Sequence, residues 1–271
     1  MLKQRILTAL VLAPLALWGI WASPLPVFAA ILAVIFALAG WEWARLSGLA
    51  GVSGRIAYVA LLLLGMAGLY FGLTVDNLAL AVFVLALVWW SMALMMVLSF
   101  PQGSEMWRRS GLARGIAGLF ILLPAWLALV VLHGQVEDGP GWVILLVMLV
   151  WAADTGAYFA GRALGHHKLA PRVSPGKTWE GAAGGLLLAL LIALLGSLWL
   201  SPGGGMVAFV VLVLLTIAIS VLGDLVESLF KRITDIKDSG GLLPGHGGML
   251  DRIDSLTAAA PLFVLGMVWL G

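Results

Sequence analysis

Long apolar segments alternate with short polar ones along the whole chain. Each apolar segment approaches the length of about 20 residues that an α-helix needs to cross a bilayer. The first two are shorter and are separated only by the turn-forming sequence SPLP, which favours a tilted hairpin. The predicted spans are residues 6–22, 26–41, 56–74, 78–100, 115–133, 142–164, 179–200, 206–223 and 251–271. This pattern predicts an all-α polytopic integral membrane protein with about nine transmembrane helices.

The amino-acid composition supports this class. Of the 271 residues, 62% are hydrophobic and 10% are charged, whereas a soluble domain would carry roughly a quarter charged residues. Cysteine is absent, which excludes disulfides and thiol catalysis. The formal net charge of +2 is too small to indicate a nucleic-acid partner. The basic and then apolar N-terminus is also compatible with a signal peptide, but its length and the spans that follow favour a first membrane helix.

Positive charge predicts the orientation of the helices. If the N-terminus is cytoplasmic and nine helices alternate, the outer connections SPLP, TVDN, HGQVEDGPG and SPGGG contain no Lys or Arg. All the basic residues then fall on the inner side: Lys3, Arg5, Arg45, Arg55, Arg108, Arg109, Arg114, Arg162, Lys168, Arg172, Lys177, Lys231, Arg232, Lys237 and Arg252. Cytoplasmic loops normally show an excess of these residues, so we expect the C-terminus on the outside.

The chain contains no linker long enough to separate soluble domains, so residues 1–271 are expected to form one membrane domain. Residues 1–140 supply N-terminal helices to which the sequence assigns no role. Residues 141–271 supply the remaining helices and the polar cytoplasmic loops. The candidate chemistry is therefore confined to the C-terminal half.

The first polar feature is Asp154, in the cytoplasmic half of the sixth predicted span. An ionisable residue at this depth costs about 2.5–3.5 kcal/mol to insert and usually faces protein or water. Asp154 is therefore a candidate catalytic residue, and the alternative is a structural Asp bonded to a neighbouring helix. Ala157, Gly161 and Gly165 share one helix face, which favours close helix packing over a functional role.

The second feature is the sequence SPGKTWEG, which resembles a phosphate-binding turn at the start of the seventh span. Glycine lets the backbone approach a ligand, Lys177 supplies a point charge, and a helix N-terminus favours anions. Ser174 and Lys177 are therefore candidate substrate-binding residues. The first glycine of a Walker A loop is missing, and the alternative is a helix cap with Lys177 at the lipid headgroups.

The third feature is the densest polar segment, residues 223–255. Asp224, Glu227, Ser228 and Lys231 share one face of a helix that continues the eighth span to the cytoplasmic surface. After a glycine-rich turn, Asp251 and Asp254 lie three residues apart on one face, in the first turn of the last span. We therefore expect carboxylates from two adjacent helices to meet at their inner ends.

Several carboxylates in one place repel unless a cation joins them. Carboxylate oxygens select Mg²⁺ or Ca²⁺, and Mg²⁺ typically joins one or two carboxylates to substrate phosphates. We therefore predict a Mg²⁺ site at Asp224, Asp251 and Asp254. The alternative is a solvated loop of mutual salt bridges. Zinc is not indicated, because this loop has no Cys and no paired His at ligand spacing.

At these residues the sequence resembles the CDP-diacylglycerol synthase, or phosphatidate cytidylyltransferase, family. The family signature appears without departure as Ser228, Lys231-Arg232, Lys237-Asp238, Gly240, Pro244, His246-Gly247-Gly248 and Asp251-Arg252-Ile253-Asp254. The segments WAADTGAYFAGRALG and SPGKTWEG resemble its other polar segments. The resemblance covers the chain from about residue 140, whereas the N-terminal half matches only as a set of apolar spans.

The resemblance implies that CMP is transferred from CTP to phosphatidic acid, giving CDP-diacylglycerol and pyrophosphate for phospholipid biosynthesis. It also implies Mg²⁺, a contribution from K⁺, membrane lipids as surroundings, a homodimer, and a bacterial-type inner membrane with the active site on the cytoplasmic side. The candidate catalytic residues are Asp154, Asp224, Lys231 and Asp251. The candidate substrate-binding residues are Ser174, Lys177, Arg232, Lys237, His246 and Arg252.

Two other functions fit parts of the pattern. A CTP-dependent polyprenol or dolichol kinase shares the membrane, the nucleotide and the metal, but it would release CDP instead of pyrophosphate. A transporter of phosphorylated lipids or anions would often show paired repeats and broken helices in both halves, whereas here the polar motifs lie only in the C-terminal half. The complete signature favours the cytidylyltransferase.

Overall fold

The computed structural model describes residues 13–236, 240 and 247–270. Within these ranges, eight helices are long and apolar enough to cross a membrane. They are α2 (Leu25–Leu46), α3 (Val52–Phe71), α4 (Leu78–Ser99), α6 (Gly111–Gln135), α7 (Gly139–Leu164), α8 (Trp179–Gly196), α9 (Met206–Ile233) and α10 (Leu250–Leu270). The other elements are an apolar helix at Ala13–Ala22, the 3₁₀ turn η1 (Gly72–Thr74), α5 (Glu105–Arg109), β1 (Lys168–Ala170) and β2 (Ser174–Thr178).

The helices confirm the predicted class of all-α polytopic membrane protein. Each predicted span from residue 26 onward coincides with one long helix, with ends that differ by a few residues. The eighth span continues as a helix as far as Ile233, as its polar extension predicted. The first predicted span, residues 6–22, overlaps the helix at Ala13–Ala22, and its earlier residues lie outside the described ranges. The count of nine spans therefore stays a prediction.

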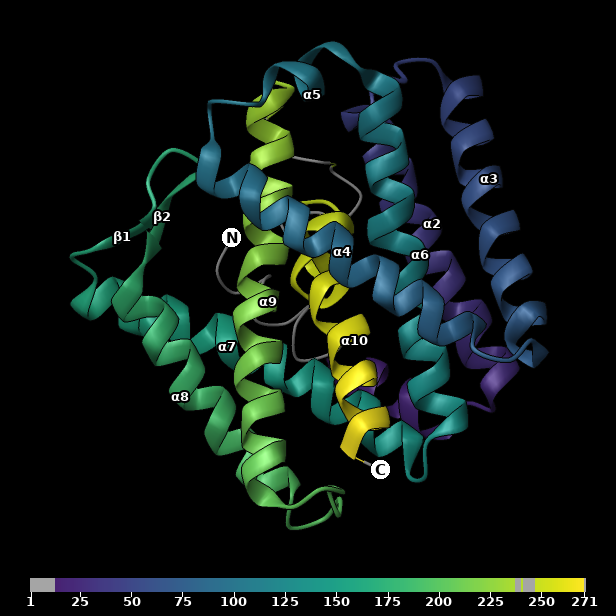
Figure 1. Cartoon of the computed structure of the whole chain (residues 1–271), viewed down its shortest axis with the longest axis vertical. Helices are drawn as coiled ribbons and strands as arrows, with labels where there is room; N and C mark the ends of the chain where they lie inside the picture. The colour runs from purple at the N-terminus through teal and green to yellow at the C-terminus, as the bar shows by residue number, and fades with distance from the viewer. Residues whose placement is uncertain (1–12, 237–239, 241–246, 271) are drawn as a thin grey trace.

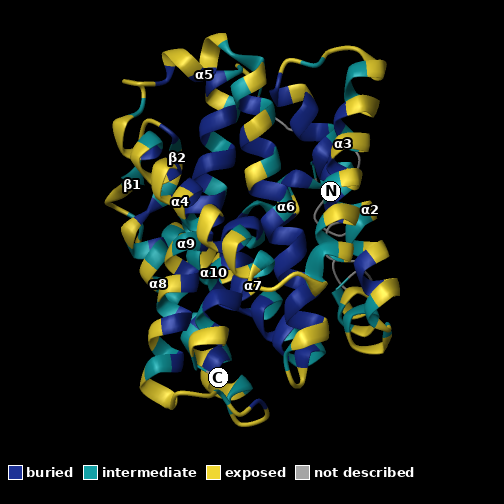
Figure 2. Cartoon of the chain, turned by 45° about the vertical axis from the view of Figure 1, so that its right-hand side comes forward, coloured by how far each residue is buried: buried dark blue, intermediate teal, exposed yellow. Residues whose placement is uncertain are grey.

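Successive helices run in opposite directions (Figure 1). Helix α5 and the C-terminal end of α9 lie at the top of that view, whereas the α6–α7 and α8–α9 connections and the C-terminus lie at the bottom. Figure 2 shows α6 largely buried, while the outer helices carry exposed residues along their length. Many of these exposed residues are large and apolar, as in Leu64, Val88 and Leu187, which is typical of a surface that faces lipid.

Helices α7 and α8 touch through glycines. A Cβ atom at Gly185 would lie 2.4 Å from the carbonyl oxygen of Ala153, and one at Gly156 would lie 2.5 Å from that of Gly184. One turn closer to the hairpin, a Cβ atom at Gly181 would lie 2.9 Å from the carbonyl oxygen of Ala157. The close packing predicted on the Ala157 face of α7 is confirmed, and it brings Asp154 beside α8.

The segment between α7 and α8 corrects one prediction. Residues Ser174–Thr178 form strand β2, which pairs antiparallel with β1, and the helix begins only at Trp179. The sequence SPGK is therefore an extended strand and not a turn at the start of a helix. Pro175 gives the physical reason, because proline disfavours helical backbone at the residue before it and lacks an amide hydrogen. Thr178 then caps α8 by accepting the amide of Gly181 at 3.1 Å.

Candidate active site

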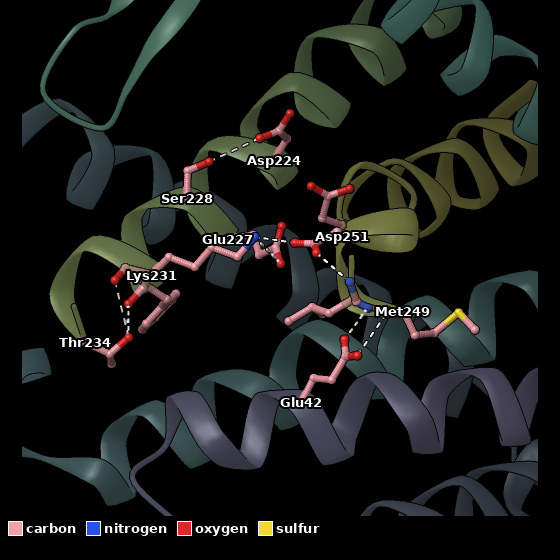
Figure 3. A network of polar contacts seen from close by, with 12 residues as sticks. Glu42, Asp224, Glu227, Ser228, Lys231, Thr234, Met249 and Asp251 are labelled. Carbon is pink, nitrogen blue, oxygen red and sulfur yellow. Dashed lines mark hydrogen bonds and ion pairs between the residues drawn. The ribbon is translucent and has the colours of Figure 1, made fainter. Parts of the chain in front are cut away.

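The last turns of α9 present the predicted row of polar side chains on one face (Figure 3). The hydroxyl of Ser228 donates to Oδ1 of Asp224 at 3.3 Å, and Nζ of Lys231 lies 3.0 Å from Oε1 of Glu227. Both pairs join residues four apart, as helix geometry requires. The Glu227 side chain is only 5% exposed, so its carboxylate depends on Lys231 for charge compensation.

The first turn of α10 meets this row. Oδ1 of Asp251 pairs with Nζ of Lys231, and Oδ2 of Asp251 accepts the amide of Gly248 at 2.8 Å. Gly247 adopts a φ of +82°, and a Cβ atom there would lie 2.8 Å from Oδ2 of Asp251. Glycine is therefore required at this position both for its backbone conformation and for space. One lysine thus joins carboxylates from two helices.

Helices α9 and α10 also approach closely one turn further into the molecule. A Cβ atom at Gly223 would lie 2.5 Å from the carbonyl oxygen of Asp254, so the residue before Asp224 packs directly on the α10 backbone. Asp254 interacts electrostatically with Asp224. The helix starts at Leu250, so Asp251 lies in its first turn and Asp254 follows one turn later. The prediction that both lie in the first turn is wrong for Asp254, because α10 begins where Asp251 accepts the Gly248 amide.

A polar cavity of about 580 Å³ lies between α7, α8, α9 and β2. Asp154, Arg162, Lys177 and Asp224 are its charged lining residues. Nζ of Lys177 lies 2.7 Å from Oδ2 of Asp224, so strand β2 delivers its lysine to the helix that carries the acidic row. Asp154 interacts electrostatically with both residues and with Arg252. The cavity therefore brings together Asp154, the lysine of the SPGK segment and the acidic row of α9, which the sequence presented as three separate polar features.

The connected charges include more acids than bases. Ion pairs and electrostatic interactions link five carboxyl groups, those of Asp154, Asp224, Glu227, Asp251 and Asp254, to three basic groups, those of Lys177, Lys231 and Arg252. Hard oxygen donors with an excess of negative charge fit a divalent cation such as Mg²⁺ in their chemistry. Among the described residues, no three acids or histidines are already grouped as metal ligands. Lysine ammonium groups occupy the places beside Asp224 and Asp251.

The remaining predicted residues are less central or lie elsewhere. Ser174 pairs with Ala170 in the hairpin and is not a lining residue of the polar cavity. Arg232 is exposed and donates from Nε to the carbonyl oxygen of Val173 at 3.3 Å, which ties α9 to the hairpin. Arg252 is exposed on α10. Lys237 and His246 lie outside the described residues.

A second cavity, of about 740 Å³, lies between α4, the hairpin, α8 and α9. Its lining is apolar except for Arg172 near the hairpin. Leu169, Ala182, Ile217 and Val221 line both cavities, so the two spaces share a wall. A polar compartment and an apolar compartment therefore adjoin at the start of α8 and the middle of α9.

Sequence reasoning missed Glu42 as a residue of this region. Glu42 lies on α2, is 2% exposed, and accepts the amides of Met249 and Leu250 at the start of α10. The predicted second span ended at Trp41, which left Glu42 just outside it. A carboxylate between two tryptophans at the end of an apolar segment was the available signal. Glu227 was placed on the acidic face but was assigned no role.

Comparisons with known proteins show the family of the chain. The cytidylyltransferase family matches residues 3–270. Phosphatidate cytidylyltransferase from Pseudomonas aeruginosa is 48% identical over 99% of this chain and 97% of its own length. The protein of the same name from Haemophilus influenzae is 40% identical over 97% of each chain. A shorter match, 44% identical over 46% of this chain, links it to the Bacillus subtilis phosphatidate cytidylyltransferase. The chain therefore belongs to the cytidylyltransferase family.

Proposed function

We propose that this protein is a phosphatidate cytidylyltransferase. An oxygen of the phosphatidate phosphate attacks the α-phosphorus of CTP, the bond between the α-phosphorus and the bridging oxygen breaks, and pyrophosphate leaves. The product is CDP-diacylglycerol. The observation that carries the proposal is the junction of the two cavities, because one substrate is a water-soluble triphosphate and the other is a lipid. Family membership and the names of the relatives support the same reaction.

The chemistry demands little proton transfer from the protein. The attacking phosphate is already anionic at neutral pH, so the protein must mainly position two anions and offset their repulsion. Lys177 and Lys231 are suited to this task because each points its ammonium group into the acidic cluster. Phosphate oxygens would compete with Asp224 and Asp251 for these ammonium groups.

Mg²⁺ belongs to the proposal as the group that neutralises the triphosphate. Asp224, Asp251 and Asp254 would hold it, because they come from adjacent helices and carry hard oxygen donors. Asp154 would complete the acidic wall of the nucleotide compartment. We also propose K⁺ as an assisting cation, as the family resemblance implies.

The apolar cavity is proposed as the lipid compartment. Acyl chains would lie between α4, α8 and α9, and Arg172 would meet the phosphate of phosphatidate at the hairpin. The distribution of Lys and Arg supports an active site on the cytoplasmic side, and the bacterial relatives support a bacterial-type inner membrane. A homodimer is part of the proposal through the family resemblance.

Purified protein in detergent with CTP labelled at the α-phosphate and with phosphatidate tests the reaction directly. We expect label in CDP-diacylglycerol and one pyrophosphate released per product, with loss of activity on chelation and recovery with added Mg²⁺. Release of CDP with label-free lipid would identify a lipid kinase instead. Unchanged activity in excess chelator would overturn the Mg²⁺ part of the proposal and leave the reaction standing.

A further inference from the structure

A carboxylate from the N-terminal half holds the start of α10. Both oxygens of Glu42 are used: Oε1 accepts the amide of Met249 at 3.0 Å, and Oε2 accepts that of Leu250 at 2.8 Å. The first amides of a helix have no partner within the helix, and the positive end of the helix dipole favours an anion there. Glu42 therefore acts as a cap supplied by another helix, about 200 residues earlier in the chain.

The same helix also holds the end of α9. Trp43, the residue after Glu42, is buried and contacts Phe230 edge to face, with ring centroids 5.1 Å apart. Phe230 directly precedes Lys231. Nε1 of Trp43 donates to the carbonyl oxygen of Arg114 at 2.8 Å, which fixes the indole ring against α6. Two consecutive residues of α2 thus contact the two helix ends that carry Lys231 and Asp251.

Three consecutive backbone amides connect Glu42 to the acidic cluster. Gly248 donates its amide to Asp251, while Met249 and Leu250 donate theirs to Glu42. The backbone from residue 248 to residue 250 is therefore held by two carboxylates, one of which is Asp251 itself. Figure 3 shows Glu42 rising from α2 to this segment, with Asp251 on the other side of it.

We propose that Glu42 is a positioning residue for the cytidylyl transfer. By holding the start of α10, it keeps the Asp251 carboxylate in register with Lys231 and the acidic face of α9. The inference rests on the proposed function and gives α2 a role within it. A carboxylate is suited to this task because it accepts two amides at once, which no apolar side chain does.

Gly240 offers a second way to disturb the same carboxylate. A Cβ atom at Gly240 would lie 2.1 Å from Oε1 of Glu42 and 2.6 Å from its Cδ. Gly240→Ala should therefore displace the Glu42 carboxylate without changing Glu42. The clash disappears in a protein that also carries Glu42→Ala, because the side-chain atoms that Cβ would meet are gone.

The test compares Glu42→Gln, Gly240→Ala, Glu42→Ala and the double variant with the wild-type protein. Glutamine keeps one acceptor oxygen but turns an NH₂ group toward the other amide, so α10 loses one bond and gains a donor–donor contact. We expect kcat to fall about 10- to 100-fold, because a misplacement of about 1 Å can cost up to about 100-fold. The KM values for CTP and phosphatidate should change less than about threefold, because Lys177 and both cavities are untouched.

Gly240→Ala should show the same pattern, a lower kcat with nearly unchanged KM values. The variant that carries both Gly240→Ala and Glu42→Ala should be no less active than Glu42→Ala alone.

The matched control is Glu105→Gln, which makes the same chemical change at an exposed carboxylate that pairs with Arg109 on α5. Its kcat should equal that of wild type. Hydrogen exchange of the peptide that includes Met249 and Leu250 supplies a readout independent of catalysis, and we expect it to accelerate in Glu42→Gln.

Several outcomes would overturn the inference. A folded Glu42→Gln protein with wild-type kcat would exclude a positioning role, and so would a loss of activity that the folded fraction explains completely. If Glu42→Gln does not fold, the Gly240→Ala variant provides the test. A wild-type kcat together with wild-type hydrogen exchange at Met249 and Leu250 in that variant would refute the inference. A wild-type protein that makes no CDP-diacylglycerol would instead refute the proposed function, while the exchange result would still show whether Glu42 holds α10.

Discussion

Individual charges in this site are paired across elements, and the paired residues are those proposed to bind the substrates and Mg²⁺. Lys177 of β2 pairs with Asp224 of α9, and Lys231 of α9 pairs with Asp251 of α10. Their side chains are between 17% and 32% exposed, so water does not fully screen them. Such pairs hold the site together and leave both partners within reach of phosphates or a cation.

Lys177→Ala should weaken the use of CTP more than that of phosphatidate. The lysine lines the polar cavity and not the apolar one, so its removal takes a positive charge from the nucleotide compartment. We expect the KM for CTP to rise about tenfold or more, as for the loss of one charge-assisted contact. Steady-state kinetics with each substrate varied in turn provide the measurement. Lys168→Ala, at an exposed lysine of the same hairpin, is the control and should be neutral. A rise confined to the KM for phosphatidate would indicate that Lys177 binds the lipid substrate instead of CTP.

Asp251→Asn should lower activity by orders of magnitude while the protein still folds. The substitution keeps size and polarity but removes the charge proposed to hold Mg²⁺ and to pair with Lys231. Asp224→Asn should behave alike, and the double variant should lose little more, as expected for residues that act through one ion. Thermal unfolding and Mg²⁺ titration of the activity are the measurements.

Asp235→Asn is the control for this substitution, because Asp235 is exposed beyond the end of α9 and its φ of +53° is one that asparagine tolerates. If Asp251 serves only the ion pair with Lys231, the Asn variant will keep the wild-type dependence on Mg²⁺ and near-normal turnover.

At the scale of elements, glycine contacts decide where the polar residues lie. The contact of α7 with α8 brings Asp154 and Lys177 to one cavity, and the contact of α9 with α10 at Gly223 brings Asp224 near Asp254. Without a hydrophobic force between helices in lipid, close backbone packing of this kind is a main source of association. The same contacts that stabilise the fold therefore assemble the site.

Gly185→Ala should disturb both stability and activity. Its Cβ atom would lie 2.4 Å from the carbonyl oxygen of Ala153, which is backbone and cannot turn away. Separation of α7 from α8 should cost about 1–3 kcal/mol, as overpacking typically does, and should move Asp154 away from Lys177.

Gly68→Ala on α3 is the matched control, since its Cβ atom would meet nothing within 4 Å. It should be neutral or slightly stabilising, because alanine favours a helix over glycine. Thermal unfolding in detergent and kcat provide the measurements for both variants. Equal stability of the two would show that the α7–α8 contact can relax.

At the scale of the whole molecule, the alternating helices bring α5, with Arg108 and Arg109, and the C-terminal end of α9, with Lys231 and Arg232, to the same end of the bundle (Figure 1). This arrangement agrees with the orientation that the distribution of Lys and Arg predicts, with the N-terminus inside and the C-terminus outside. The polar loops of the C-terminal half and the end of α2 would then share the cytoplasmic side. Water-soluble CTP would reach the site from that side, and the lipid would reach it from the bilayer.

Reporter fusions after Gly139 and after Gly271 test this orientation. Both should report an outer location, whereas a fusion after Arg109 should report a cytoplasmic one and serves as the internal control. A cytoplasmic signal at Gly139 or Gly271 would break the predicted alternation, and with it the proposed access of CTP.

The sequence by itself determined the membrane class, the approximate helices from residue 26 onward and the family. These depend on local properties: the length of apolar runs, the exclusion of charge from lipid, and an uninterrupted run of motif residues. The spacing of Asp224, Glu227, Ser228 and Lys231 also predicted their shared face correctly, because helix periodicity alone specifies it.

Only the tertiary structure decided which charges meet. The pairs Lys177–Asp224 and Lys231–Asp251 and the cap from Glu42 to α10 join segments that no local pattern connects. The strand at Ser174–Thr178 likewise depends on pairing with β1, so a turn was predicted in its place. For each lysine the sequence offers several acidic partners, so the sequence alone does not specify the pair. Long-range packing of the helices decides which pair forms. Helix–helix distances at Gly185 and Gly223 selected among them, because they fix which side chains come within bonding reach.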